Sequence, residues 1–319
     1  MQILRNTEQL EPAVEHAVTI GTYDGVHIGH RTVIDATRRL AGELGLRTAV
    51  VTFHPHPASV LRPDSAPLML TDLDQRLDLL ATAGVDTALV IPFDLEASQE
   101  TAERFVERVL VDCIRARVIV VGDDFHFGKG RAGNVEVLTE LGRIHGFEVT
   151  GLDLLPQPDR SESVSSTAVR RAVADGDVAT AARLLGRYHE VRGPVVTGDQ
   201  RGRTIGFPTA NVAVPRDRAL PGDAVYAGWY LRPDGSHHPA AINIGKRPTF
   251  YQDAEHSLME AHLIDFDGDL YGQEARVCFV EKLRGEQRFD GIDALAAQLQ
   301  DDIAAARALL AEAAPPDQG

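Results

Sequence analysis

The sequence predicts an α/β domain followed by an all-β domain: a parallel sheet layered with helices over residues 1–187, then an antiparallel barrel with a terminal helix over residues 188–319. Three observations carry this prediction. The chain of 319 residues is longer than most single hydrophobic cores. Short apolar runs alternate with helix-period segments up to about residue 155. After Tyr188, apolar residues instead recur at every second position.

Five apolar runs predict buried strands in the N-terminal domain. They are residues 17–20, 48–53, 87–91, 117–122 and 147–155. Amphipathic segments separate them, and in residues 32–44 the apolar side chains form one stripe that Gly45 ends. Strands that alternate with helices form βαβ units, so we expect a parallel sheet. Residues 161–187 predict two more short helices.

Shorter runs with period-two alternation predict the strands of the C-terminal domain. They are EVRGPVV, AVYAGWYL, AAINIG, LMEAHLIDF and ARVCFVEKL, separated by Gly, Pro and Asp turns. Such strands form an antiparallel barrel or a sandwich. An amphipathic segment at residues 292–312 predicts a helix that covers it.

The composition, with 44% hydrophobic and 25% charged residues, is that of a soluble globular protein. A net charge of −15 argues against non-specific binding to nucleic acid or to anionic membranes. The sequence has no run of 18 apolar residues and no signal-peptide pattern. We therefore expect a cytoplasmic protein with no nucleic-acid or membrane partner, and the sequence leaves a homo-oligomer open.

The segment GTYDGVHIGH, residues 21–30, joins the first predicted strand to a helix. In parallel sheets, ligands bind beyond the carboxyl ends of the strands, where this segment lies. His27 and His30 are three residues apart and so share one face of the first helical turn. The N–H groups of a helix N-terminus, with Gly21 and Gly25 for close backbone approach, suit a phosphate ligand.

Two other interpretations fit this histidine spacing. One is a turn that carries two surface histidines without a ligand. The other is a metal site that His54 and His56 complete, although no H-E-x-x-H or equivalent pattern accompanies them.

The pattern G-x-[FY]-D-G-x-H-x-G-H resembles the signature of the HxGH nucleotidyltransferase superfamily, particularly of prokaryotic FAD synthetases. The resemblance continues in the same order through TFHPHP (52–57), VGDDFHFGKGRAGN (121–134) and SSTAVR (165–170). It implies a Rossmann-like fold that transfers the adenylyl group of ATP to FMN. Such a transfer needs stabilisation of phosphate charge and no protein nucleophile.

This resemblance also implies roles for individual residues. The ATP-binding residues would be Gly21, Tyr23, Asp24, Gly25, His27, His30, Ser166, Thr167 and Arg170. The flavin-binding residues would be Pro55, Pro57, Asp124, Phe125 and Phe127. Catalysis would depend on His27, His30 and Arg170. Tyr23 stands where the family usually has Phe, and Asp124 stands where some members have Asn, which leaves the flavin contact of Asp124 open.

The segment GDQRGRTIGFPTANVAV, residues 198–214, combines a glycine-rich turn with two oxygen-bearing side chains. Glycines let backbone N–H groups converge on phosphate. The Thr209 hydroxyl and the Asn211 carbonyl are hard ligands that suit Mg²⁺. Taken alone, however, PTAN is a turn followed by a strand.

Three later segments, INIGKRPTF (242–250), MEAHLIDFDGDLYG (259–272) and EKLRGEQRFDG (281–291), extend the pattern, and together they resemble riboflavin kinase. The resemblance implies an ATP site that includes Gly202 and Thr209, and a Mg²⁺ site formed by Thr209 and Asn211. It implies that Glu260 is the catalytic base and that Glu260 and Arg284 approach the flavin. The alternative for Glu260 is an ordinary outward-facing carboxylate on a strand.

Over residues 15–312 the chain is thus similar to the prokaryotic bifunctional riboflavin kinase/FAD synthetases. The resemblance implies phosphorylation of riboflavin to FMN and adenylylation of FMN to FAD with release of pyrophosphate. The partners would be ATP, riboflavin and FMN, with Mg²⁺ as cofactor. Two alternatives remain: a nucleotidyltransferase for another acceptor whose barrel only binds a ligand, and a flavin-binding regulator that has lost catalysis.

Overall fold

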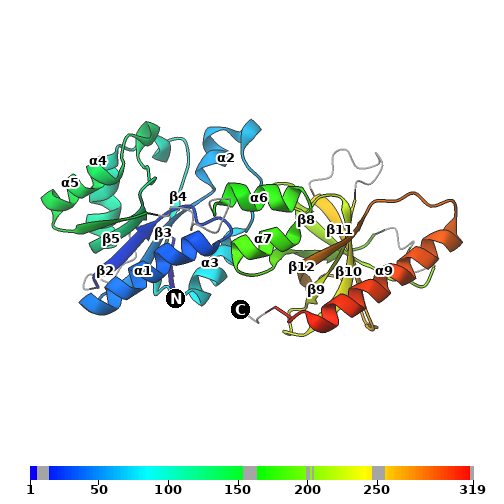
Figure 1. The fold of residues 1–319 in the computed structure, drawn as a ribbon. Coiled ribbons are helices and arrows are strands. Elements are labelled where there is room, and N and C mark those ends of the chain that lie inside the picture. The colour runs from blue at the N-terminus through cyan, green and yellow to red at the C-terminus, as the bar shows by residue number, and fades with distance from the viewer. Residues whose placement is uncertain (6–13, 154–163, 199–201, 203–204, 246–255, 317–319) are drawn as a thin grey trace. The chain divides into compact units, whose positions relative to one another are not determined.

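The computed structural model describes residues 1–319 except 6–13, 154–163, 199–201, 203–204, 246–255 and 317–319 (Figure 1). The chain packs into two compact units. The first, here called the sheet unit, contains residues 1–67 and 72–164. The second, the barrel unit, contains residues 68–71 and 165–318. The packing units meet at residues 164 and 165, whereas the sequence predicts a boundary between functional domains after residue 187. That functional boundary stays a prediction.

The sheet unit is built on six strands, and every neighbouring pair is parallel. Their spatial order is β1 (Gln2–Leu4), β4 (Thr87–Pro92), β3 (Arg47–His54), β2 (His16–Ile20), β5 (Ala116–Gly122) and β6 (Glu148–Leu152). The prediction of a parallel sheet is confirmed. The edge strand β1 was not predicted, because three residues are too few to show a period.

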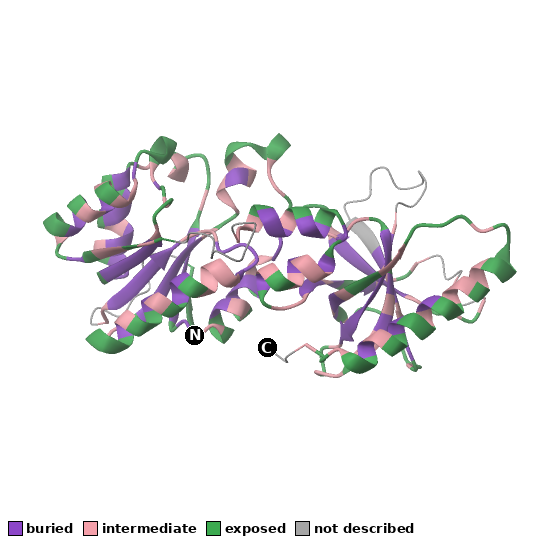
Figure 2. Ribbon diagram, viewed as in Figure 1, coloured by how far each residue is buried: buried purple, intermediate pink, exposed green. Residues whose placement is uncertain are grey.

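Helices cover both faces of this sheet. They are α1 (Ile28–Leu44), α2 (Pro57–Leu61), α3 (Leu73–Thr82), α4 (Ala102–Phe105), a π-helix at Val106–Cys113 and α5 (Val135–His145), with 3₁₀ turns at Pro63–Ser65, Ala97–Gln99 and Lys129–Arg131. On one face, Ile34 of α1 and Leu80 of α3 pack with Val50 of β3. On the other, Leu110 and Leu138 pack with Val51. Both faces are therefore buried (Figure 2), which explains the unbroken apolar runs in the strands.

The barrel unit contains a closed barrel whose neighbouring strands are all antiparallel. The order around the barrel is β10 (His237–Ile244), β11 (His256–Leu263), β8 (Ala210–Pro215), β7 (His189–Val196), β12 (Glu274–Gly285) and β9 (Ala224–Leu231). Large side chains such as Tyr226, Tyr230, Ile242 and Phe279 fill its interior and are fully buried. The prediction of an antiparallel barrel is confirmed.

Among the residues that the structure describes, the barrel unit contains the helices α6 (Ser166–Ala174), α7 (Val178–Leu185) and α9 (Ile292–Glu312). The terminal helix α9, predicted over the same residues, buries Ala306 and Leu310 against Trp229. The two short helices predicted within residues 161–187 are α6 and α7. Their apolar side chains cluster with Leu70 and Ala219, so by packing they belong to the barrel unit.

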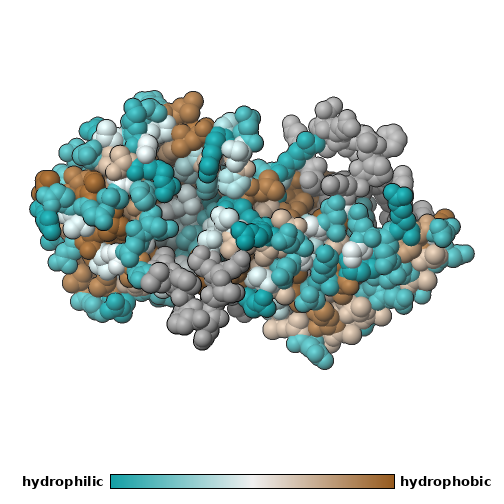
Figure 3. Space-filling view, turned by 45° about the horizontal axis from the view of Figure 1, so that its top comes forward, coloured by the Kyte–Doolittle hydropathy of each residue, from teal (hydrophilic) through white to brown (hydrophobic). Residues whose placement is uncertain are grey.

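The surface is in large part polar on the face that Figure 3 shows, with hydrophilic side chains spread over both units. Among the residues that the structure describes, no helix is both long and apolar enough to cross a lipid bilayer.

Candidate active sites

The first site begins where β2 ends, in a loop that covers Gly21–His27. Three of its residues have positive φ: Tyr23 at 51°, Gly25 at 82° and Val26 at 36°. A residue other than glycine in such a conformation costs on the order of 1–3 kcal/mol, so its surroundings must hold it there. One such support is the 2.6 Å hydrogen bond between the hydroxyl groups of Tyr23 and Thr19. Burial raises the pKa of Tyr23, so its phenol stays protonated.

His27 and His30 lie against each other at the start of α1. Their rings stack with centroids 3.6 Å apart and planes 16° apart. His27 is the N-cap, and its Nδ1 accepts the backbone N–H of His30 at 3.3 Å. The proton of the neutral His27 ring therefore resides on Nε2, which can donate to an anion. The structure thus brings together the two histidines that the spacing placed on one face.

Two neighbours make this close arrangement possible. A side chain at Gly29 would come within 3.2 Å of the His27 imidazole, and one at Gly21 within 3.1 Å of the Tyr23 ring. Asp24, predicted to bind ATP, is fully buried. Its carboxylate is thus part of the loop's interior, and its role toward ATP stays a prediction.

Arg76 is a residue of this site that sequence reasoning missed. Its side chain is on α3, it is 2% exposed, and its Nη1 donates to the carbonyl of Thr22 at 2.9 Å and to the carbonyl of Phe53 at 3.0 Å. A signal was available, since residue 76 falls on the apolar stripe that Leu73, Leu77 and Leu80 define. A charge on such a stripe is uncommon unless buried partners hold it.

The predicted flavin-binding residues lie at the ends of β3 and β5. Pro55 is exposed and Pro57 begins α2, while the Asp124 side chain is exposed. Phe125 and Phe127 stack with centroids 5.4 Å apart.

Further rings extend this pair into an aromatic cluster. Phe127 contacts Phe105, which in turn contacts Phe53, and Phe53 contacts Phe93. Phe127 is 7% exposed and belongs to the core, whereas Phe125 is only partly buried and has the more accessible ring. An aromatic wall at this edge suits a flat, apolar ring system such as a flavin.

The interpretation of His54 and His56 as metal ligands gains no support. Nδ1 of His56 accepts the backbone N–H of Ala58 at 3.0 Å and so caps α2. Within the described residues, no three His, Cys, Asp or Glu side chains are grouped so that they could hold a metal ion.

Ser166, Thr167 and Arg170 lie in the first turns of α6, in the barrel unit. Ser165 caps this helix by accepting the backbone N–H of Ala168 at 3.2 Å. Nε of Arg170 donates to the carbonyl of Leu68 at 2.6 Å. The Ser166 and Arg170 side chains are half-buried and that of Thr167 is exposed.

The second site lies on adjacent strands of the barrel. Asn211 on β8 is directly opposite Glu260 on β11, and Glu260 is opposite Asn243 on β10. Directly opposite residues point to the same side of a sheet, with Cβ atoms roughly 5 Å apart. Met259 and Ala261 are buried inside the barrel, so Glu260 faces outward, as the alternation indicated. The register nevertheless brings it to the predicted metal ligand.

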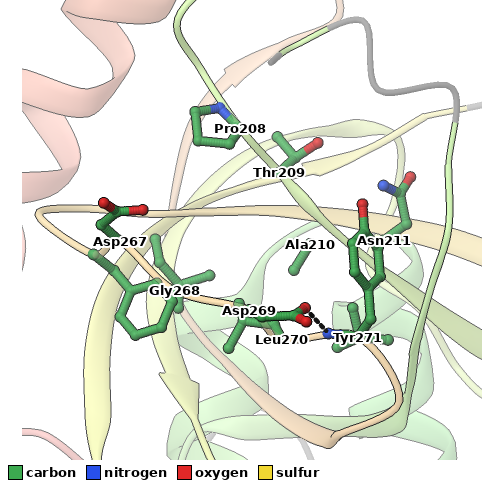
Figure 4. A pocket seen from close by; sticks show the side chains of 12 residues that line it. Pro208, Thr209, Ala210, Asn211, Asp267, Gly268, Asp269, Leu270 and Tyr271 are labelled. Atoms are coloured by element: carbon green, nitrogen blue, oxygen red, sulfur yellow. Dashed lines mark hydrogen bonds between the residues drawn. The ribbon is translucent and has the colours of Figure 1, made fainter.

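Thr209 and Asn211 also line a cavity of about 550 Å³ (Figure 4). The other lining residues are Val195, Pro208, Ala210, Leu263, Phe266, Asp267, Gly268, Asp269, Leu270 and Tyr271. The stretch Leu263–Tyr271 belongs to the segment 259–272 that resembles riboflavin kinase, but no site role was predicted for it. Asp269 accepts the backbone N–H of Tyr271 at 3.0 Å and so shapes the turn that walls the cavity.

The chain around Thr209 is held by close contacts. Nδ1 of His262 donates to the carbonyl of Pro208 at 2.7 Å. Gly202, predicted to bind ATP, accepts the backbone N–H of Phe207 at 2.8 Å, and a side chain there would overlap the Phe207 carbonyl. These contacts fix the backbone at Phe207 and Pro208, which lead into β8.

Arg284, predicted to approach the flavin, is engaged elsewhere in this structure. Its Nε and Nη2 donate to the carboxylate of Asp302 on α9 at 2.9 and 2.7 Å. The guanidinium also lies 5.7 Å from the centre of the Phe289 ring. Asp302 is 4% exposed, so this pair ties α9 to β12.

Comparisons with known proteins match this chain to two enzyme families. Residues 10–168 match the family model described as FAD synthetase, and residues 185–310 match the model described as riboflavin kinase. A bifunctional riboflavin kinase/FMN adenylyltransferase of Escherichia coli is 39% identical over 309 residues, which are 96% of this chain and 97% of the relative. Its counterpart in Pseudomonas fluorescens is 40% identical over 315 residues, 98% and 99% of the two chains.

A solved structure is also similar over nearly the whole chain. It is named a macrolide-efflux protein from Streptococcus pneumoniae, is 30% identical and has a TM-score of 0.85. The similarity covers 96% of this chain and 98% of that one.

Proposed function

The chain belongs to the bifunctional riboflavin kinase/FMN adenylyltransferase family, and from that premise we propose how its residues carry out the two reactions. It is an enzyme of flavin cofactor biosynthesis that makes FMN from riboflavin and FAD from FMN. A match to the riboflavin kinase family over residues 185–310 argues against a barrel that only binds a ligand.

In adenylylation, a phosphate oxygen of FMN attacks the α-phosphorus of ATP. A new P–O bond forms, the bond between the α- and β-phosphates breaks, and pyrophosphate leaves. No protein nucleophile takes part, so the enzyme contributes position and charge stabilisation. Nε2 of His27, the ring of His30 and the first N–H groups of α1 are the donors for the phosphate oxygens.

From the resemblance, Ser166, Thr167 and Arg170 bind the triphosphate of ATP. The hydroxyl groups and the guanidinium in the first turns of α6 are suited to phosphate oxygens. Phe125, together with Pro55 and Pro57, is the surface on which the isoalloxazine ring of FMN binds.

In the kinase reaction, Glu260 accepts the proton of the ribityl 5′-hydroxyl of riboflavin while that oxygen attacks the γ-phosphorus of ATP. The products are FMN and ADP. The observation that carries this assignment is the register that sets Glu260 opposite Asn211, next to the cavity that Thr209 and Asn211 line.

Mg²⁺ fits the residues of this cavity. The hydroxyl of Thr209, the amide oxygen of Asn211 and the carboxylates of Asp267 and Asp269 are hard oxygen donors among the residues that line the cavity. When bound with ATP, Mg²⁺ would neutralise phosphate charge there.

Replacing Glu260 by Gln tests the kinase assignment. The variant keeps the shape but loses the base, so FMN formation should fall about 10²- to 10⁴-fold. Conversion of supplied FMN to FAD should stay near the rate of the parent, because that chemistry belongs to His27 and His30. Thr209→Ala should raise the Mg²⁺ concentration that the kinase needs and leave FAD formation unchanged.

Chromatography of reactions with riboflavin, ATP and Mg²⁺ measures both products. Asp223→Asn, an exposed carboxylate in the same unit outside the cavity, is the matched control. Kinase turnover in Glu260→Gln within a few-fold of the parent would show that Glu260 is not the base. Absence of both products from the parent would favour the regulator that has lost catalysis.

A further inference from the structure

Arg76 places a buried guanidinium between two segments of the first site. Its Nη1 contacts three oxygen atoms: the carbonyls of Thr22 and Phe53 at 2.9 and 3.0 Å, and the Thr52 hydroxyl at 3.2 Å. The Thr52 hydroxyl itself donates to the Thr22 carbonyl at 3.1 Å. One arginine thus joins the loop after β2 to the end of β3.

The loop that Arg76 holds is the strained one. Thr22 precedes Tyr23, whose φ of 51° is unfavourable for a residue with a side chain, and Val26 has a φ of 36°. His27 follows directly and caps α1. The direction of the His27 imidazole therefore depends on how firmly the backbone at Thr22 is fixed.

Folding alone does not call for a charge at this position. The helix α3 turns Leu77 and Leu80 into the core, and an apolar residue at 76 would continue that stripe. Arg76 instead donates hydrogen bonds to oxygen atoms of the loop and of β3.

We propose that Arg76 is a positioning residue for adenylyl transfer: it fixes the loop after β2 against β3, and thereby aims the His27 and His30 donors. This inference rests on the proposed function of the two histidines. Arg76 itself touches neither ATP nor flavin in this role. It acts through the carbonyl of Thr22.

The test compares Arg76→Met and Arg76→Lys with the parent as full-length proteins. Misplacing catalytic groups by about 1 Å typically costs on the order of 10²-fold in rate, so Arg76→Met should lower kcat for FAD formation by about that factor. KM for ATP and for FMN should change less than about three-fold, because Arg76 makes no substrate contact. Lysine restores one donor and should recover part of kcat.

Two internal controls separate positioning from stability. FMN formation from riboflavin, which belongs to the barrel unit, should be unchanged in both variants. Arg108→Met removes an arginine of the sheet unit that pairs with Glu100 at 2.7 Å. Arg108→Met should lose as much stability as Arg76→Met, but its kcat for FAD formation should not fall.

Thr52→Val provides a second route if Arg76→Met does not fold. It removes one acceptor of Arg76 and the hydroxyl that reaches Thr22, with little change in volume. Its kcat for FAD formation should fall several-fold at unchanged KM. A folded Arg76→Met, or in its absence Thr52→Val, with kcat equal to the parent overturns the inference. A parent that makes no FAD refutes instead the proposed function on which it rests.

Discussion

Replacing Gly198 by alanine should disable the kinase reaction by displacing one side chain. A Cβ atom at residue 198 would lie 2.5 Å from the Cγ, Nδ2 and Oδ1 atoms of Asn211. Favourable contacts between such atoms begin near 3.5 Å, so the amide must move by about 1 Å. Asn211 is 6% exposed and lies opposite Glu260, so the movement disturbs both Asn211, the predicted metal ligand, and Glu260.

The expected loss follows from this displacement. A shift of about 1 Å in a positioned group can reduce the rate by roughly 10²-fold. Backbone strain adds nothing, since Gly198 is not among the glycines with positive φ. The assay is the initial rate of FMN formation from riboflavin, ATP and Mg²⁺, with FAD formation from FMN as internal reference. FAD formation should be unchanged.

Gly291→Ala is the matched control, because its added methyl group meets no atom within 4 Å. Both variants should unfold at similar temperatures. FMN formation by Gly198→Ala within two-fold of the parent would refute the reasoning, because the Asn211 amide would then not need its position in the structure.

Three further predictions follow from contacts in the structure. His27→Ala and His30→Ala should each slow FAD formation by about 10²- to 10³-fold and spare FMN formation; stoichiometric zinc that is lost in these variants would contradict this. Burial alone would raise the pKa of Glu190, but hydrogen bonds and charge from Arg276 and Arg192 hold it below the ordinary 4.5. This contribution to stability is present above the ordinary value and is lost as pH falls through the lowered one. In urea unfolding, Glu190→Gln should therefore be less stable than the parent by about 3–5 kcal/mol at neutral pH, with the gap narrowing as pH falls below the ordinary value; a constant gap would be evidence against it. Asp302→Asn and Arg284→Lys should lower the unfolding temperature alike, whereas a rise in the riboflavin KM in Arg284→Lys alone would support its predicted flavin contact.

Much of the fold could be predicted because its signals are local. The strands buried on both faces appear as unbroken apolar runs. The end of α1 could be predicted from Gly45, which adopts the left-handed conformation with φ of 68°. The stacking of His27 and His30 follows in the same way from a spacing of three residues.

What could not be predicted depends on contacts between distant residues. Arg76 reaches Thr22 across 54 positions of sequence, and only the resulting fold shows what its charge is for. Leu70 and Ala219 receive the apolar faces of α6 and α7, although neither has a local pattern that indicates it. The cavity wall at Asp267–Tyr271 likewise depends on the closure of the barrel.

The four residues 68–71 have a consequence for recombination between relatives. Met69 donates its N–H to the carbonyl of Asp217 and accepts that of Ala219, so this short stretch is built into the barrel unit although the sheet unit flanks it on both sides. The chain therefore passes from one unit to the other at three points. A chimera joined only after residue 164 would set one parent's Met69 against the other parent's Asp217 and Ala219. Exchange of a complete barrel unit requires three junctions, and selection on such hybrids would act on residues 68–71 together with residues 217–219.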